Sequence, residues 1–440
     1  MRNPVRNGVR FLLLMTLFSL LIPLAQSQQM SNFDRDRALL MLDNVAKEIQ
    51  KHYYDPKFHG VDWDATVRDA KQRIKASTSF NMALAHIAQA VVSLNDSHTF
   101  FLPPSRPYVH DYGYQTIMIG DHCYIIRVRP GSDAETKGLK PGDELLTLDG
   151  YSPDRENLWK MEYRYNVLRP ELRLQLALRD VQGQQSQVEV MAKFKELARV
   201  KDVTGNGIWG LVRDAENQQH LLRPRWAEVG DDVLILKLPV FMLDQSHVEE
   251  MIDKARKRPA LILDLRDNPG GAVDTLKYLL GGIFEKDVKI GDRVGRKEFK
   301  PEIAKSLNHG VFAGKVVVLI DSRSASAAEL FARIVQIEKR GVVVGDRSSG
   351  SVMEAKRYTY SEGADVKVFY GAEITESDLI MSDGKSLEHR GVTPDELVLP
   401  TAADLRAGRD PVLSRAAGIL GAKLTPEDAG KLFPYEWPKE

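Results

Sequence analysis

Cysteine is almost absent from this chain of 440 residues, which holds a single thiol at Cys123. One thiol cannot form an intramolecular disulfide, so stability must come from packing. Cys123 opens an apolar stretch, residues 123–128, which favours a buried structural thiol over a nucleophile. No Cys/His cluster has the spacing of metal ligands, so no metal site is expected.

A net charge is also missing, because 61 Lys and Arg residues balance 61 Asp and Glu residues. This balance argues against a nucleic-acid partner and against a polybasic membrane ligand. No internal repeat or low-complexity stretch is evident. With 43% hydrophobic and 28% charged residues, the composition is that of an ordinary globular protein. The length suits two or three domains.

A long apolar run occurs only near the N-terminus. Three arginines within the first ten residues precede an apolar stretch over residues 11–25, and small residues follow at Ala25 and Ser27. The run of about 15 residues is shorter than the ~20 needed to span a bilayer. It therefore predicts a cleaved export signal over residues 1–27 rather than a membrane anchor. The mature chain would be periplasmic or extracellular, with no stable membrane anchor.

The remaining chain divides into four segments by its hydrophobic pattern. Residues 28–105 show helical periodicity, and residues 106–196 carry hairpin and glycine-turn signals. In residues 197–400, continuous apolar runs alternate with helical patterns, which predicts a parallel or mixed sheet covered on both faces. Residues 401–440 are predicted to be a helical tail without identifiable chemistry.

Three long motifs carry a family resemblance. They span residues 261–271, 321–329 and 387–395. Their order and spacing resemble the C-terminal-processing (tail-specific) serine peptidases of family S41. The order of glycine turns in residues 106–196 resembles a PDZ domain. The resemblance implies a crotonase-like α/β peptidase core, in which helices cover a mixed sheet, with an N-terminal helical region and an inserted PDZ-like β domain.

Ser326 is the candidate nucleophile. It lies between an apolar strand pattern and a helical pattern that begins near Ala327, and a helix N-terminus stabilises negative charge. The residues alone leave open a small-residue stretch that serves close packing, with a serine as helix N-cap. The family resemblance assigns the nucleophile to Ser326, and Ser324 is the second candidate.

The glycines of Asn268-Pro269-Gly270-Gly271 are the candidate oxyanion turn. Two glycines after a buried strand allow the backbone to approach a ligand. The resemblance implies that an amide of this turn stabilises the oxyanion together with the amide of Ala327. Gly270 is favoured and Gly271 is the alternative; an ordinary tight turn is the structural alternative.

The general base departs from the best-known family pattern, a Ser–Lys dyad. The position of that lysine is occupied by Ser351, and the nearest downstream lysine is Lys356. The chain instead resembles a lysine-lacking branch similar to the core domain of tricorn protease. That resemblance implies His98 as the base, oriented by Glu388 through Ser97. A neutral imidazole can accept a proton near pH 7.

Both assignments have structural alternatives. His98 would also suit a helix C-terminal cap, and Glu388 a surface ion pair with Arg390. The charged residues Asp264, Arg266 and Asp395 of the same motifs are interpreted as structural.

The PDZ resemblance implies a peptide site at the loop Tyr112-Gly113-Tyr114-Gln115. In such domains the backbone N–H groups of this loop cap the terminal carboxylate of a peptide, and Gly113 permits the conformation that this requires. The peptide would add as a strand to the edge of the sheet.

The sequence therefore predicts an exported serine endopeptidase that acts on a peptide or protein substrate, including through its C-terminus. No metal or organic cofactor and no nucleic acid is expected, and the oligomeric state is not predicted. The rival hypotheses are a catalytically inactive peptide-binding scaffold and a small-molecule binder on the same fold.

Overall fold

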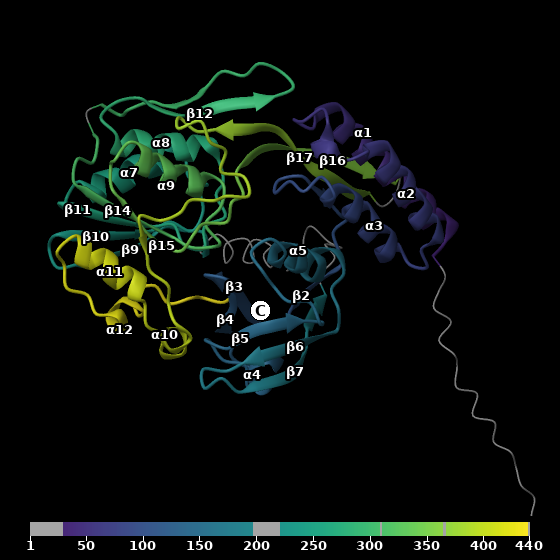
Figure 1. The fold of residues 1–440 in the computed structure, drawn as a ribbon, viewed down its shortest axis with the longest axis horizontal. Helices are drawn as coiled ribbons and strands as arrows, with labels where there is room; N and C mark the ends of the chain where they lie inside the picture. Colours follow the sequence, from purple (N-terminus) through teal and green to yellow (C-terminus); the bar gives the residue numbers. More distant parts are fainter. Residues whose placement is uncertain (1–29, 197–220, 309, 364–366, 439–440) are drawn as a thin grey trace, which may run out of the picture.

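A computed structural model describes residues 30–196, 221–308, 310–363 and 367–438 (Figure 1). The predicted export signal, residues 1–27, lies outside the described residues. Within them, no helix combines the length and apolar character that a membrane span requires.

A six-stranded sheet forms the centre of the α/β part, and all neighbouring strands are parallel except the β9–β10 pair. Its order across the sheet is β18 (Glu396–Leu397), β15 (Val342–Gly345), β14 (Lys315–Ile320), β11 (Ala260–Asp264), β10 (Val233–Lys237) and β9 (Arg225–Val229). Because parallel strands end at the same edge, the loops after β11, β14 and β15 meet there.

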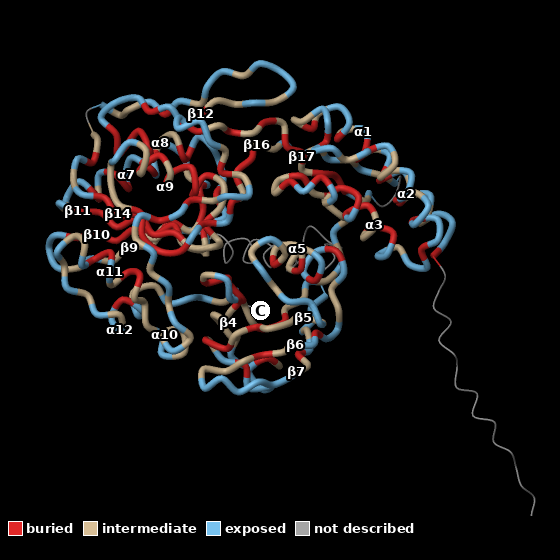
Figure 2. Tube along the Cα trace, viewed as in Figure 1, coloured by how far each residue is buried: buried red, intermediate tan, exposed pale blue. Residues whose placement is uncertain are grey.

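Helices cover both faces of this sheet. Along β11, Leu261 and Leu263 enter one core and Ile262 enters the other, as the alternation of strand side chains requires. The first core is closed by α7 (Gln245–Ala255), α8 (Val273–Ile283) and α9 (Ala327–Ile337). The second is closed by α11 (Pro411–Ile419) and α12 (Pro426–Ala429), which follow α10 (Ala402–Ala407). Figure 2 shows buried segments running through this region. The predicted mixed sheet covered by helices is confirmed.

The N-terminal helices pack on a strand from late in the sequence. These helices are α1 (Asn32–His52), α2 (Trp63–Ala76) and α3 (Phe80–Val92). The 3₁₀ turn Phe58–Gly60 lies in the connection between α1 and α2. They share a core with Tyr370, Ala372 and Ile374 of β17 (Val368–Ile380). The N-terminal helical region therefore packs directly against β17, a strand that follows the nucleophile motif in the sequence.

A second sheet connects the helices to the α/β part. Its strands run in the order β1 (Phe100–Leu102), β17, β12 (Val288–Gly295) and β13 (Glu302–Ala304), and β16 (Met353–Glu362) also pairs with β17. The pairing of β1 with β17 holds the loop between α3 and β1, which contains Ser97 and His98. This loop is thereby brought toward the α/β part.

A small antiparallel sheet makes up the third unit. Its order is β3 (Tyr114–Ile119), β4 (His122–Val128), β5 (Glu144–Leu148), β6 (Arg173–Arg179) and β7 (Gln185–Met191). It carries α4 (Asp133–Thr136), α5 (Leu158–Glu162) and the π-helical turn Tyr163–Leu168, and the ribbon of β2 (Tyr108–Asp111) and β8 (Lys193–Glu196) lies beside it. Cys123 is buried in the core of this sheet, and burial raises the pKa of its thiol to about 12. A neutral, buried thiol fits the predicted structural role.

Candidate active site

Three loops converge at the edge where β11, β14 and β15 end. Ala325 N–H donates to the carbonyl of Asn268 at 2.9 Å, which joins the first two loops. Ser326 N–H donates to the carbonyl of Ser351 at 2.8 Å, which joins the second loop to the third. The candidate nucleophile therefore lies where all three loops meet.

Ser326 has a strained backbone. Its φ of 53° and ψ of −119° lie in a region that non-glycine residues rarely adopt. Such strain persists only where surrounding contacts fix it, and it is common at functional sites. Ser326 is half-buried and immediately precedes α9, whose first N–H, that of Ala327, has no acceptor within the helix. The nucleophile and a potential oxyanion donor are thus adjacent.

Ser324, the second candidate, is held in the interior. It is fully buried, and its hydroxyl donates to the carbonyl of Leu265 at 2.9 Å. The same hydroxyl accepts the N–H of Asp321 at 2.9 Å. These contacts tie the loop to β11 and favour a structural role for Ser324.

The glycine turn lies against Ser326. A Cβ added to Gly270 would come within 2.6 Å of the Ser326 Cβ and 2.9 Å of the Ala327 nitrogen, so only glycine fits here. In this conformation Gly270 N–H donates to Oδ1 of Asn268 at 2.8 Å. Among the described residues, the N–H of Gly271 donates no hydrogen bond. The geometry therefore favours Gly271 over Gly270 as the amide open to a ligand.

His98 and Glu388 are joined through Ser97, as the resemblance implied. The Ser97 hydroxyl lies 2.8 Å from Nδ1 of His98 and donates to Oε2 of Glu388 at 2.8 Å. Ser97 N–H donates to Oε1 of Glu388 at 2.9 Å. The side chain of Glu388 is 9% exposed, and its carboxylate contacts Ser97 and lies 3.6 Å from Nε2 of His389.

The direction of these bonds fixes the tautomer of His98. An ionised carboxylate only accepts hydrogen bonds, so the single hydroxyl proton of Ser97 goes to Glu388. The Ser97 oxygen then accepts a proton from Nδ1–H of His98. This leaves Nε2 as the basic nitrogen of a neutral imidazole. The network has the polarity that a general base requires.

Backbone bonds connect this network to the nucleophile loop. Val352 N–H donates to Oε2 of Glu388 at 2.9 Å, and the preceding residue, Ser351, accepts the N–H of Ser326. Lys356, the alternative base, is exposed on β16, with Nζ 5.5 Å from the ring centre of Tyr358. Since a base lysine must be buried to lose its charge at neutral pH, this placement argues against Lys356.

Glu329 is a buried residue of this site that the sequence interpretation did not single out. It is fully buried on the first turn of α9, and its carboxylate accepts four hydrogen bonds. The donors are the N–H groups of Ser326 (3.0 Å), Gly350 (2.7 Å) and Ser351 (2.9 Å) and the hydroxyl of Ser348 (2.6 Å). Burial raises the pKa of Glu329 to about 7, although these bonds oppose the shift. The spacing of a capping box, Ser326 to Glu329, was the available sequence signal.

The loop predicted to bind a peptide carboxylate is engaged within the protein. Gly113 N–H donates to Oδ1 of Asp111 at 2.7 Å, and the hydroxyl of Tyr112 bonds to the backbone of Glu171. Gly113 has a φ of 76°, and a Cβ there would lie 2.4 Å from the Cβ of Ser132. The predicted backbone conformation is therefore present, but the amide of Gly113 has an internal partner.

The free edge of β3 is covered by the nucleophile loop. Arg323 donates through Nη2 to the carbonyl of Thr116 at 2.7 Å, and the Ser322 hydroxyl donates to the carbonyl of Met118 at 2.6 Å. Arg323 also forms an ion pair with Glu162 at 2.5 Å. In this conformation a peptide strand added at β3 would have to displace both side chains.

The charged residues interpreted as structural are paired. Arg266 bridges Asp264 and Asp410 at 2.8 and 2.7 Å, and these contacts hold the pKa of Asp264 well below its ordinary value. Asp395 accepts the N–H of Val343 at 2.8 Å. Through Asp410, the C-terminal segment, in which no chemistry was identified, forms an ion pair with Arg266 at the end of β11, just before the glycine turn.

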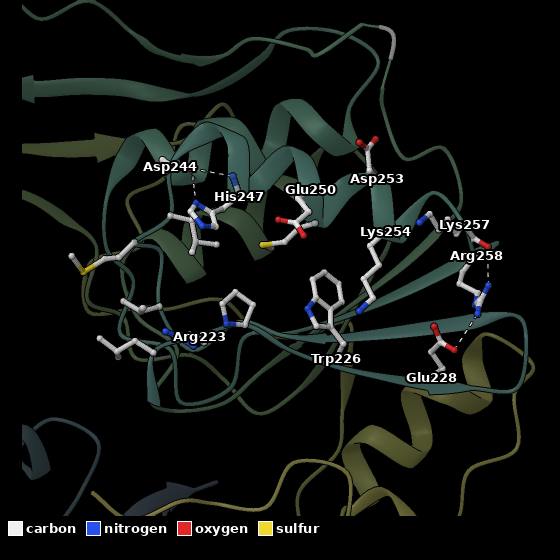
Figure 3. Close-up of a pocket in the computed structure, with 16 residues that line it drawn as sticks. Arg223, Trp226, Glu228, Asp244, His247, Glu250, Asp253, Lys254, Lys257 and Arg258 are labelled. Atoms are coloured by element: carbon white, nitrogen blue, oxygen red, sulfur yellow. Dashed lines mark hydrogen bonds and ion pairs between the residues drawn. The ribbon is translucent and has the colours of Figure 1, made fainter. Parts of the chain in front are cut away.

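A cavity of about 1090 Å³ lies between β9 and α7, near the glycine turn (Figure 3). Trp226 and Lys254 face each other across it, with Nζ 4.5 Å from the ring centre. Val240 and Met242 also line it, and between them Phe241 N–H donates to the carbonyl of Gly270 at 2.8 Å. The cavity thus offers an apolar wall next to the candidate oxyanion turn.

A serine at the start of a helix, a glycine turn beside it and a histidine linked to a carboxylate are elements that serine hydrolases use. Residues 232–398 match the family model of Peptidase family S41. The predicted resemblance to peptidase family S41 is confirmed over these residues, which make up most of the α/β part of the chain.

Known proteins are similar over most of this chain. The tail-specific protease of Haemophilus influenzae is 23% identical over 379 residues, which are 76% of this chain and 51% of that protein. The chain therefore spans about half the length of that relative. A Streptomyces coelicolor protein named as a homolog of tricorn protease is 22% identical over 86% of this chain and 32% of its own. The solved structure of mature CPAF covers 85% of this chain and 96% of its own, with 17% identity and a TM-score of 0.62, and shares the fold.

Proposed function

We propose that this chain is a serine endopeptidase that hydrolyses peptide bonds through an acyl-enzyme on Ser326. The observation that carries the proposal is the hydrogen-bond chain from Glu388 through Ser97 to His98, tied by backbone bonds to the strained Ser326. The match to peptidase family S41 supports the same activity.

The reaction uses the residues in sequence. Oγ of Ser326 attacks the peptide carbonyl while Nε2 of His98 takes its proton, and the carboxylate of Glu388 stabilises the resulting imidazolium through Ser97. His98 then protonates the leaving amine as the C–N bond breaks. Water, deprotonated by His98, attacks the acyl carbonyl, and His98 returns that proton to Oγ of Ser326 as the ester C–O bond breaks and the new carboxylic acid leaves.

The tetrahedral oxyanion is stabilised by two backbone amides. Ala327 N–H at the start of α9 is one donor, and the helix N-terminus adds a favourable potential. The second comes from the turn of Gly270 and Gly271. Gly271 is the preferred donor because Asn268 already accepts the N–H of Gly270. A substrate side chain next to the scissile bond fits the part of the cavity that Val240, Met242 and Trp226 line, while charged residues such as Asp244 and Lys254 line the rest.

The small sheet serves as a PDZ-like unit, inserted at residues 106–196 between the helical region (28–105) and a crotonase-like peptidase core (197–400). Its edge strand β3 follows a positive-φ glycine, Gly113, as a peptide-capping loop requires. The loop Tyr112–Gln115 would receive the C-terminal carboxylate of a protein substrate once Asp111 and Arg323 move aside.

The chain acts after export. The charged and apolar pattern of residues 1–27 supports signal-peptide cleavage near Ser27. Mass spectrometry of the protein recovered outside the cytoplasm tests this, since an uncleaved N-terminus there would refute it.

A serine-directed fluorophosphonate separates the peptidase from its rivals. Such a probe should label Ser326 in the folded protein, and Ser326→Ala should lose both labelling and peptide hydrolysis while the circular dichroism spectrum stays unchanged. Ser324→Ala should retain labelling. An unlabelled, correctly folded protein would instead be the inactive scaffold or the small-molecule binder.

A further inference from the structure

The last described residues of the chain leave the α/β part and cross to the small sheet. Phe433 packs near the core beneath the six-stranded sheet, and Arg225 donates to the carbonyl of Pro434 at 2.8 Å. In Figure 1 the last yellow part of the ribbon runs from beside α10 and α11 toward β3 and β4. Residues 435–438, here called the tail, therefore lie on a different unit from the helices that precede them.

Two aromatic rings of the tail rest on two arginines of the small sheet. The guanidinium carbon of Arg127 lies 4.0 Å from the ring centre of Tyr435, and that of Arg129 lies 4.5 Å from the ring of Trp437. Both pairs are spaced two residues apart, so an extended tail matches the strand spacing of the arginines. Cation–π contacts of this kind are favourable when arginine is positioned over an aromatic face.

Polar contacts fix the register of the tail. Gln115 Nε2 donates to the hydroxyl of Tyr435 at 2.7 Å, and Arg129 donates to the carbonyl of Pro438 at 3.1 Å. The two tail rings also meet edge to face, with centres 5.1 Å apart. A nonspecific apolar contact would not require these hydrogen bonds.

Arg127 and Arg129, here called the arginine platform, lie next to both the predicted capping loop and the candidate oxyanion turn. Arg129 forms an ion pair with Asp111 at 2.6 Å, and Asp111 is the residue that occupies the amide of Gly113. Arg127 donates to Gln115 at 2.7 Å and lies 3.1 Å from Asp267, which precedes the glycine turn. A ligand on the platform thus contacts side chains next to the capping loop and next to the oxyanion turn.

We propose that Gln115, Arg127 and Arg129 form a binding site for peptides with two aromatic residues at alternate positions, and that the tail occupies it as an intramolecular ligand. The inference rests on the proposed recruitment of peptides by the small sheet and adds a side-chain preference to it. A tethered ligand has an effective concentration on the order of millimolar, so the tail excludes peptides of moderate affinity. Partners that displace it carry the same pattern, such as Tyr-x-Trp.

The test compares the full chain with a chain that ends at Pro434. The probe is the fluorescein-labelled peptide Tyr-Glu-Trp-Pro-Lys-Glu, the sequence of residues 435–440, and the measurement is fluorescence anisotropy. The shortened chain should bind it at least ~10-fold more tightly than the full chain, as release of a tethered competitor predicts. Arg129→Ala in the shortened chain should abolish this binding.

A point variant guards against misfolding of the shortened chain. The double change Tyr435→Ala and Trp437→Ala in the full chain should also tighten binding, whereas Phe369→Ala, which removes an exposed aromatic ring on β17, should not. Equal affinity of full and shortened chains, or binding that survives Arg129→Ala, would overturn the inference. Fluorophosphonate labelling of Ser326 in the same samples reports the proposed peptidase separately: labelling without peptide binding refutes only the platform, and binding without labelling refutes only the peptidase.

Discussion

Ser97 donates both its N–H and its hydroxyl to the carboxylate of Glu388, at 2.9 and 2.8 Å. This two-point contact holds the loop before β1 against the segment after β17, so residues separated by almost 300 positions form one proton-handling unit. The hydroxyl is the only described link that passes from this carboxylate to the imidazole of His98.

Ser97→Ala should therefore slow catalysis without preventing folding, because the N–H contact to Glu388 remains. We expect kcat to fall about 10- to 100-fold, the equivalent of a charge-assisted hydrogen bond of about 1.5–3 kcal/mol, with KM little changed. Steady-state kinetics on a fluorogenic peptide measures this. Ser97→Thr, which keeps a hydroxyl, should recover most of the rate; a variant pair with equal rates would show that the hydroxyl does not orient His98.

His98→Ala should lower kcat by roughly 10³-fold or more, as loss of a triad base does. Lys356→Ala should change kcat by less than about twofold, because Lys356 is exposed on β16. If His98→Ala stayed active while Lys356→Ala lost activity, the enzyme would use a Ser–Lys dyad with a shifted lysine.

The sequence predicted the parts of the site that are carried by contiguous motifs. The nucleophile loop, the glycine turn and the buried strands could be located because each motif joins an apolar run to a turn of small residues, whereas the resemblance was needed to choose Ser326 over Ser324. Ser97, His98 and Glu388 were found through the resemblance, since no periodicity relates residues so far apart. In the folded protein these three side chains are in hydrogen-bond contact.

The contacts that could not be predicted from the sequence depend on how the small sheet and the strand ends of the α/β part pack together. Arg323 bonds to Thr116 only because the small sheet turns its β3 edge toward the nucleophile loop. The four donors around Glu329 come from strand ends that become neighbours through parallel pairing of β14 and β15. The sequence favoured the Gly270 amide as oxyanion donor on the motif alone. In the structure the side chain of Asn268 accepts the N–H of Gly270, which leaves Gly271 as the preferred donor.

Glu329 should make stability depend on pH. Its pKa rises from the ordinary 4.5 in the unfolded chain to about 7 in the folded protein because of burial. The folded state therefore binds the extra proton between these values, so the contribution of Glu329 to stability is fully present below pH ~4.5 and is lost as pH rises through ~7. A shift of this size corresponds to about 3 kcal/mol.

Glu329→Gln isolates this contribution, because the amide does not titrate. Urea unfolding at pH 5 and pH 8 should show the wild-type chain losing more of its unfolding free energy than Glu329→Gln, by up to about 3 kcal/mol. Other titrating groups are common to both proteins and cancel in the comparison. If both proteins lost the same unfolding free energy between pH 5 and pH 8, the group that titrates would not be Glu329.

Arg323 should control access to the edge of β3. Its guanidinium donates to the carbonyl of Thr116 at 3.1 and 2.7 Å and pairs with Glu162 on α5, so it occupies a backbone acceptor that an added strand would use. Arg323→Ala removes this competition. Non-aromatic peptides with a free C-terminus should then bind about tenfold more tightly than to the wild-type chain, and more tightly than their amidated forms.

The control is Arg333→Ala on α9. This change also removes an ion pair of an arginine, with Asp383 at 2.5 Å, but away from the β3 edge, so peptide affinity should stay unchanged. Gly113→Ala in the Arg323→Ala background should abolish the gain, because the new Cβ would collide with Ser132 and the φ of 76° disfavours alanine. Isothermal titration calorimetry with matched free and amidated peptides gives both comparisons. Unchanged affinity in Arg323→Ala would mean that the β3 edge serves only to dock the small sheet on the nucleophile loop, and equal affinity for free and amidated peptides would refute carboxylate capping at Gly113.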